Sequence, residues 1–192
     1  MRAAVFLGKE KIEIRDVPIP EIGEDEALVK VAFTGICGTD LHIYKGHLPV
    51  DVPRILGHEI SGEVVSVGRN SHGIREGDRV VVEPNFSCGR CTYCRIGRKN
   101  LCKYKVRLGV DIDGGFAEYV KVKADSLWKL DDSISLEEGA LVEPLSVAVR
   151  AVNRAGLNVG STVAIIGAGP IGLLTLLPVS YTHLTLPTNR EV

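Results

Sequence analysis

Short apolar runs separated by turn residues fill the chain up to about residue 135. Runs of this length, bounded by clusters of Gly, Pro, Asp and Asn, are typical of β-strands. The last of them also alternates apolar and polar residues with period two, as a half-buried strand does. The predicted strands are Ala27–Phe33, Gly62–Val67, Arg79–Val82 and Phe116–Val122. This pattern predicts an all-β first domain, either a barrel or a sandwich.

The pattern becomes helical at Ser135. Ser135 is a suitable N-cap residue, and Glu138, three positions later, completes the sequence of a capping box. A helix is predicted over Leu145–Ala155, with Gly156 placed to cap its C-terminus. The change of pattern places the domain boundary near residue 150.

A unit of α/β type is indicated beyond this boundary. Thr162–Ile166 is a fully apolar run typical of a buried parallel strand, and Leu173–Leu177 has a helical pattern. Between them lies Gly-x-Gly-x-x-Gly, which after a strand and before a helix is typical of dinucleotide binding. An ordinary structural turn is the alternative. The predicted cofactor-binding residues are Gly167, Gly169, Pro170, Ile171 and Gly172.

The overall charge excludes some classes of partner. The 192 residues include 23 Lys and Arg and 24 Asp and Glu, which gives a net charge of −1. This balance offers no basic excess for nucleic acid or for a membrane surface, so neither is expected to bind. The N-terminus lacks a signal-peptide pattern, and no apolar run approaches the roughly 20 residues of a membrane span. We therefore expect a cytoplasmic protein whose five cysteines are thiols or metal ligands.

Four of these cysteines lie within 15 residues, in the spacing Cys-x2-Cys-x2-Cys-x7-Cys. A tetrahedral Zn²⁺ site needs four soft ligands about 2.3 Å from one point, and two-residue spacings let a short loop provide them. An iron–sulfur cluster and ordinary free thiols are the alternatives, but the ferredoxin run continues differently, with x3 and a proline. Four protein ligands leave no open position, so the predicted zinc is structural. The ligands are Cys88, Cys91, Cys94 and Cys102, with Arg90, Arg95, Arg98 and Lys99 beside them to offset the thiolate charge.

Other candidate ligands are scattered along the chain, namely Cys37, the adjacent pair His58 and Glu59, and Glu143. Each has an ordinary explanation when it is taken singly. A lone cysteine is more often a small buried apolar residue, and a lone histidine is more often a satisfied core or surface residue. Glu143 suits an exposed helix surface. Spacing alone therefore leaves a second metal site open.

Six motifs occur in the order found in one protein family. They are Cys37-Gly-Thr-Asp-x-His, Gly57-His-Glu-x2-Gly-x-Val, Gly77-Asp-Arg-Val, the four-cysteine segment, Gly114-Gly-Phe-Ala-Glu-Tyr and Glu143-Pro-Leu. The chain resembles the zinc-containing medium-chain dehydrogenases, and most closely their polyol branch of sorbitol, butanediol and threonine dehydrogenases. The resemblance extends from residue 1 to about residue 177 without a gap.

The resemblance implies that Cys37 and His58 bind a catalytic zinc. The third protein ligand differs within the family, and here either Glu59 or Glu143 would serve. Three protein ligands leave one position for water or substrate, as a catalytic zinc requires. A carboxylate in place of a thiolate makes a harder site, which suits a hydroxyl-rich substrate.

The same resemblance implies transfer of hydride from the carbinol carbon of an alcohol or polyol to NAD or NADP. The released proton leaves through a hydroxyl, the cofactor ribose and a histidine. Thr39 and His42 stand at those catalytic positions, and Asp40 is placed to orient either one. The ordinary interpretation makes Thr39 a turn residue and His42 a solvated side chain. The particular alcohol and the choice of cofactor stay open, and the intact enzyme is expected to be a homo-oligomer.

An α/β protein is therefore expected overall. The resemblance implies a GroES-like β-barrel for residues 1–150 and the start of a truncated Rossmann-type domain for residues 151–177. Residues 178–192 do not resemble the family and are interpreted as a non-native tail, which begins with a proline unfavourable inside a helix. Because most of the nicotinamide site would be missing, we expect no turnover from these residues alone. A non-catalytic zinc-binding remnant or interaction module is the alternative.

Overall fold

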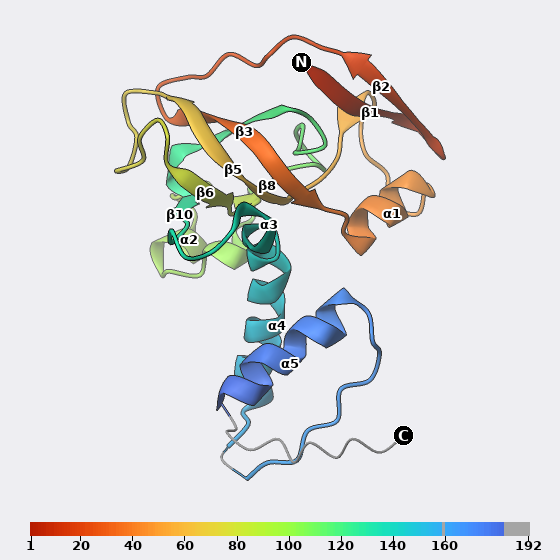
Figure 1. Cartoon of the computed structure of the whole chain (residues 1–192), viewed down its shortest axis with the longest axis vertical. Helices are drawn as coiled ribbons and strands as arrows, with labels where there is room; N and C mark the ends of the chain where they lie inside the picture. The colour runs from red at the N-terminus through yellow and green to blue at the C-terminus, as the bar shows by residue number, and fades with distance from the viewer. Residues whose placement is uncertain (159, 183–192) are drawn as a thin grey trace. The chain divides into compact units, whose positions relative to one another are not determined.

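The computed structural model describes residues 1–158 and 160–182. The chain divides into two compact units, the first of which covers Met1–Leu141 and the second of which begins at Val142 (Figure 1). The division therefore comes before the predicted position near residue 150. That position falls inside helix α4 (Val142–Ala155). The helix begins three residues before Leu145, where the sequence predicted its start.

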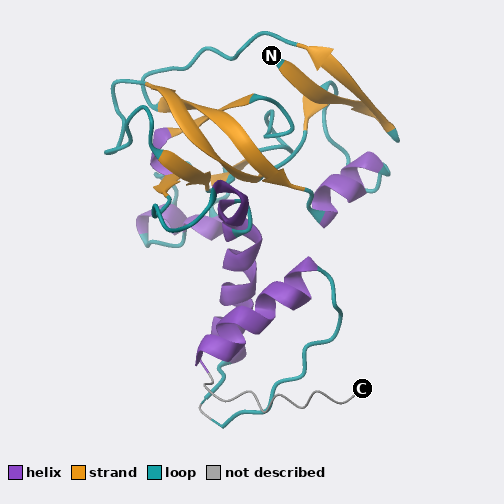
Figure 2. Ribbon diagram, in the orientation of Figure 1, coloured by secondary structure: helices purple, strands orange, loops and turns teal. Residues whose placement is uncertain are grey.

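The first unit is built around a five-stranded antiparallel sheet, which Figure 2 shows as the largest group of strands. The four predicted strands form four of its members, although the last begins at Tyr119 instead of Phe116. Its strands, in spatial order, are β10 (Leu127–Lys129), β6 (Arg79–Val82), β5 (Glu59–Val67), β3 (Glu26–Gly35) and β9 (Tyr119–Lys123).

The remaining strands form two smaller antiparallel sheets. One has the order β2 (Lys11–Asp16), β1 (Arg2–Gly8), β4 (Arg54–Ile55), and the other joins β7 (Asn85–Phe86) to β8 (Val106–Arg107). The predicted closed barrel is therefore not found among the described residues. The reason is that β9 and β10 each pair with one neighbour only, and a single bridge between Ala3 and Ala117 joins β1 to the segment before β9. One bridge is not the continuous ladder that closure requires.

The main core of this unit consists of aliphatic side chains from all five strands of the larger sheet. In β9 the buried residues Val120 and Val122 flank the half-buried Lys121, which is the alternation predicted from the sequence. Each fully buried Val, Leu or Ile side chain stabilises the fold by about 1.5–3 kcal/mol. The cluster includes Ala27, Val29, Ile60, Val64, Val80, Val82, Val120, Val122 and Leu127.

Short helices occupy the connections of the first unit. Helix α1 (Gly38–Tyr44) follows β3, α2 (Thr92–Arg95) and the 3-10 turn η1 (Lys99–Leu101) form the cysteine-rich segment, and η2 (Ala124–Ser126) precedes β10. Helix α3 (Leu136–Gly139) ends the unit.

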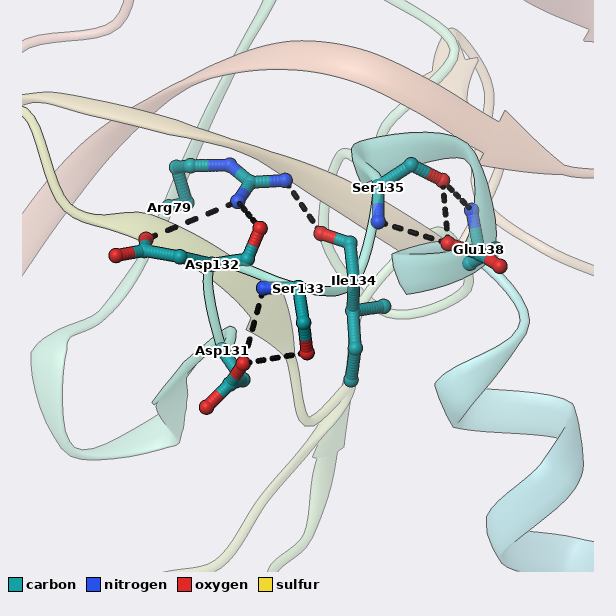
Figure 3. A network of polar contacts seen from close by, with 7 residues as sticks. All are labelled: Arg79, Asp131, Asp132, Ser133, Ile134, Ser135 and Glu138. Atoms are coloured by element: carbon teal, nitrogen blue, oxygen red, sulfur yellow. Dashed lines mark hydrogen bonds and ion pairs between the residues drawn. The ribbon is translucent and has the colours of Figure 1, made fainter.

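A polar network fixes the segment that leads into α3 (Figure 3). The guanidinium of Arg79, on β6, donates hydrogen bonds to the backbone oxygens of Asp132 at 3.3 Å and Ile134 at 2.5 Å. The predicted capping box is confirmed, since Ser135 N–H donates to Glu138 at 2.8 Å and Glu138 N–H donates to the Ser135 hydroxyl at 3.1 Å. The network ties the end of the first unit to its sheet.

The second unit contains α4 and α5 (Pro170–Thr182), and no helix of the described chain is long and apolar enough to cross a membrane. Gly156 follows α4 with a φ of 64°, as a C-cap does. The predicted strand Thr162–Ile166 is wrong, because the described residues of this unit contain no partner strand and Ile166 is 97% exposed. Pro178 lies inside α5, at a cost of about 3 kcal/mol.

Candidate metal centres

The four cysteines predicted to bind structural zinc converge on one point. The Sγ atoms of Cys88 and Cys94 are 4.0 Å apart, those of Cys91 and Cys94 3.5 Å, and those of Cys91 and Cys102 3.9 Å. Four sulfurs at the vertices of a tetrahedron around Zn²⁺, each about 2.3 Å from it, would be about 3.8 Å from one another. These three distances lie close to that value and all four sulfurs lie within 4.8 Å of one another, so the group suits a tetrahedral zinc ion.

Local backbone geometry holds these sulfurs in place. The N–H of Cys88 donates to Cys102 Sγ at 3.3 Å, and the N–H of Cys91 donates to Cys88 Sγ at 3.4 Å. A backbone hydrogen bond from Cys94 is the main cause that lowers the pKa of Cys91 to about 6, whereas burial is the main cause that raises the pKa of Cys94 to about 11. A bound metal would require all four as thiolates, so its binding would release the protons that they carry.

Cys37, His58 and Glu59 form a second group, whose ligand atoms all lie within 4.8 Å of one another. The antiparallel pairing of β3 with β5 brings them together, because Gly35 at the end of β3 pairs with Glu59 at the start of β5. Cys37 follows Gly35 by two residues, and His58 precedes Glu59. The register of this strand pair thus brings together ligands that are about twenty residues apart in the sequence.

Asp40 connects the two loops that carry these ligands. Its Oδ2 accepts a hydrogen bond from Cys37 N–H at 2.9 Å, and its Oδ1 accepts one from Gly57 N–H at 3.2 Å. The same Oδ1 lies 3.6 Å from His58 Nδ1, and Asp40 is only 3% exposed. The sequence predicted that Asp40 orients Thr39 or His42, and it did not predict that Asp40 joins the two ligand loops. Its position three residues after Cys37, at the start of α1, was the available signal, since a carboxylate there can cap the helix.

Glycine at position 35 makes room for the Glu59 carboxylate. A Cβ at position 35 would lie 2.0 Å from Glu59 Oε2 and 3.1 Å from Glu59 Cβ. The first distance is far below normal contact and the second is a few tenths of an ångström too short, so a side chain at position 35 would displace the Glu59 carboxylate from its observed place. The next glycine along the chain, Gly38, has no atom within 4 Å of such a Cβ among the described residues.

The electrostatics of the group suit a cation. A hydrogen bond with His58 is the first cause that lowers the pKa of Cys37, with further hydrogen bonds from Thr39. Burial raises the pKa of Glu59, and Asp40 adds to this effect. A buried carboxylate, a thiol with a lowered pKa and an imidazole in one place form a mixed O, S and N ligand set that is typical of zinc.

The remaining predicted residues lie in different places. Thr39 Oγ1 is 3.7 Å from Cys37 Sγ, so the structure brings Thr39 to the group. His42 lies on the exposed side of α1, where its ring centroid is 5.8 Å from that of His47. Glu143 belongs to the second unit, in the first turn of α4, whereas the grouped ligands all belong to the first unit.

The glycine turn has part of the expected geometry. Gly167 has a φ of 103°, which favours glycine, and a Cβ at Gly172 would lie 1.9 Å from the Gly167 carbonyl oxygen. The third glycine therefore permits a close approach between the turn and the helix. Pro170 and Ile171 begin α5, and Leu173 N–H donates to the Gly169 carbonyl at 2.9 Å.

Comparisons with known proteins extend these observations. Residues 23–132 match the family model of the alcohol dehydrogenase GroES-like domain. The chain is 45% identical over 181 residues to the sorbitol dehydrogenase of Bacillus subtilis, which covers 92% of this chain and 51% of the relative. It is 44% identical over 172 residues to the L-threonine 3-dehydrogenase of Caldanaerobacter subterraneus, with coverage of 88% and 49%. A solved zinc-binding dehydrogenase from Sinorhizobium meliloti, bound to NADP, has a TM-score of 0.90 at 42% identity and covers 95% of this chain and 53% of that one.

The chain thus spans about half the length of the curated relatives it matches. The family predicted from the six motifs is confirmed by both the family model and the solved structure. On this evidence the chain belongs to the zinc-containing alcohol dehydrogenase family, together with the sorbitol and threonine dehydrogenases.

Proposed function

We propose that this chain is the zinc-binding part of an oxidoreductase that transfers hydride from an alcohol or polyol to NAD or NADP. The observation that carries the proposal is the group formed by Cys37, His58 and Glu59, which offers three ligand atoms within 4.8 Å of one another. Three protein ligands leave a coordination position for a substrate oxygen, unlike the four-cysteine group. The names of the relatives support an alcohol or polyol as the substrate class.

Glu59 is proposed as the third ligand in preference to Glu143. Glu59 is buried and joins the thiol and the imidazole within the first unit. A buried carboxylate without a cation is costly, and accordingly burial raises its pKa. A divalent ion at this place would reverse that cost by favouring the charged form.

When bound, zinc supplies a Lewis acid that makes an alcohol proton easier to lose, and the nicotinamide accepts the hydride. The protein positions these partners. Asp40 holds the loops of Cys37 and His58 together through two backbone N–H groups. We propose that the Thr39 hydroxyl, 3.7 Å from Cys37 Sγ, relays the substrate proton by accepting it while giving up its own, and that His42, on the exposed side of α1, releases a proton to water.

The glycine turn is proposed to hold the cofactor pyrophosphate at the N-terminus of α5. Gly167 provides the left-handed turn, and Gly172 allows the helix to approach it. Gly169 has no atom within 4 Å of the space a side chain would fill, considering the described residues, so the backbone there is accessible to a ligand.

Metal analysis of the 192-residue chain and its variants tests the ligand assignment. We expect two zinc ions per chain, one for each group of ligands. Glu59→Ala should lose one of them, whereas Glu143→Ala should keep both. Loss of zinc from Glu143→Ala, with retention in Glu59→Ala, would reverse the assignment.

Cobalt substitution tests the open position without requiring turnover. The visible absorption of protein-bound Co²⁺ changes when a ligand is added, so sorbitol should change the spectrum of the wild-type chain. Glu59→Ala, which retains only the four-cysteine site, should show no change. If sorbitol, butanediol and threonine all leave the wild-type spectrum unchanged, a non-catalytic zinc-binding module becomes the better description. Formation of NADH would support the function and contradict the expected inactivity of these residues alone.

A further inference from the structure

The cysteine-rich segment is strongly cationic. Residues 87–106 contain six basic residues and no acidic residue, although the whole chain has a net charge of −1. All six side chains are exposed. None forms an ion pair with any of residues 1–158 and 160–182. The six are Arg90, Arg95, Arg98, Lys99, Lys103 and Lys105.

This positive charge exceeds what a structural zinc site needs. A zinc ion with four thiolates carries a net charge of −2, which two cations would balance. Backbone N–H groups already donate to two of the sulfurs. Four positive charges therefore remain, in a segment of twenty residues where they repel one another. Offsetting the thiolates, as predicted from the sequence, explains only part of this charge.

Three of the cations line a cavity on the segment. The cavity has a volume of about 630 Å³ and is lined by Arg90, Arg95 and Lys103, together with Tyr93 and Tyr104. This volume lies within the range of about 300–1,000 Å³ found for small-molecule pockets. The guanidinium groups offer forked donors that match phosphate oxygens, and the ammonium group adds a point charge.

We propose that this cavity binds a small molecule that carries more than one phosphate group. Phosphate is favoured because it needs several donors and a concentrated positive charge, both of which the lining provides. The two tyrosines supply aromatic surfaces and hydroxyls for the body of the ligand. A nucleic acid is less suitable, because it requires an extended basic track and the chain as a whole has no basic excess.

The site is separate from the proposed catalytic group. It is formed by Arg90 and Cys91, by α2 and by residues that follow η1, whereas Cys37, His58 and Glu59 belong to the ends of β3 and β5 and their loops. The inference therefore does not rest on the proposed dehydrogenase function. Binding can be measured in a protein that has no turnover.

The segment also provides a matched control. Arg98 and Lys99 are exposed cations between Cys94 and Cys102, but they do not line the cavity. Removing them changes the charge of the segment by the same amount as removing Arg95 and Lys103. A difference between the two double variants therefore reports the cavity and not the general field of the segment.

The test is calorimetric titration of the zinc-loaded chain with fructose bisphosphate at low ionic strength. We expect saturable one-to-one binding, weakened about tenfold or more in R95Q/K103Q and less than about threefold in R98Q/K99Q. Zinc content is measured for each variant. If R95Q/K103Q loses zinc, its weaker binding cannot be attributed to the cavity, and R95K/K103R takes its place in the comparison. Because that variant retains the charge but exchanges the donors, it should bind more weakly than wild type.

Three results would overturn the proposal. The first is the absence of saturable binding to the wild-type chain. The second is equal weakening in R95Q/K103Q and R98Q/K99Q, which would show a general electrostatic attraction. The third is tighter binding of a single-stranded oligonucleotide with equal dependence on both pairs of residues, which would assign the segment to nucleic acid.

Discussion

Replacing Gly35 by alanine should remove zinc from the proposed catalytic group while leaving the four-cysteine group loaded. The backbone at Gly35 is not left-handed, so alanine brings no conformational strain of its own. The effect must come from the added Cβ, which would lie 2.0 Å from Glu59 Oε2. Because Glu59 is proposed as a ligand, the substitution tests both its position and its role.

The magnitude follows from that distance. A carbon atom needs roughly 3.5 Å from its nonbonded neighbours, so the carboxylate oxygen must retreat by about 1.5 Å. Metal–ligand distances tolerate only about 0.2 Å. Loss of an outer-shell partner already costs about 10–100-fold in metal affinity, so displacement of a ligand should cost about 100-fold or more. Overpacking adds about 1–3 kcal/mol of destabilisation.

Chelator competition on the zinc-loaded chain measures this loss. Zinc at the four-cysteine site serves as an internal reference, because its ligands lie in a different segment. Gly38→Ala is the matched control, since its Cβ would meet no described atom within 4 Å and the residue lies only three positions after Gly35, at the start of α1. The reasoning is refuted if Gly35→Ala binds two zinc ions with wild-type affinity, or if Gly38→Ala loses as much affinity as Gly35→Ala.

Three further predictions concern the same unit. Asp40→Asn should lower zinc affinity at the proposed catalytic group by about 10–100-fold. The amide cannot replace the charge that faces His58, and it cannot accept hydrogen bonds through both of its side-chain atoms. Chelator competition measures this loss, and unchanged affinity would contradict the prediction. In the zinc-free protein, burial raises the pKa of Glu59 above its unfolded value. Stability that is fully present below the unfolded pKa is therefore lost as pH rises from the unfolded pKa through the folded pKa. Glu59→Gln should then unfold at higher urea than wild type at neutral pH, with the difference vanishing in acid, and a pH-independent difference would count against this explanation. Ser135→Ala should destabilise the first unit by about 1 kcal/mol at neutral pH. The first cause that lowers the pKa of Glu138 is the backbone N–H of Ser135, which alanine keeps, and the second is the Ser135 hydroxyl, which donates to Glu138 Oε2 at 2.7 Å and which alanine removes. The contribution of the hydroxyl to this carboxylate is present above the unfolded pKa and lost as pH falls through the folded pKa, so the effect of Ser135→Ala should shrink in acid. Urea unfolding at neutral and acidic pH checks this, and an effect that grows in acid would contradict it.

The parts of the fold that depend on local sequence were predictable. The capping box at Ser135 needs only a hydroxyl and a carboxylate three residues apart. The strands β3, β5 and β6 could be found because apolar runs of this length between turn residues have few alternative structures. The four-cysteine group was predictable for the same reason, since its spacing confines all four sulfurs to 15 residues.

Non-local pairing was not predictable in the same way. Thr162–Ile166 has the composition of a strand, but a strand forms only beside a partner, and the described part of the second unit provides none. Barrel closure likewise depends on hydrogen bonds between strands distant in sequence, and the described sheets remain open at β9 and β10.

By itself, therefore, the sequence determined the family, the grouping of the four cysteines and four of the five strands of the larger sheet, because these depend on spacings within one short segment or on ordered motifs. Only the tertiary structure grouped Glu59 with Cys37 and His58, through the pairing of Gly35 with Glu59. It also placed Asp40 between the two ligand loops and gathered cations around one cavity. The physical reason is that strand register and burial arise from contacts between distant segments, which a pattern of neighbouring residues does not encode.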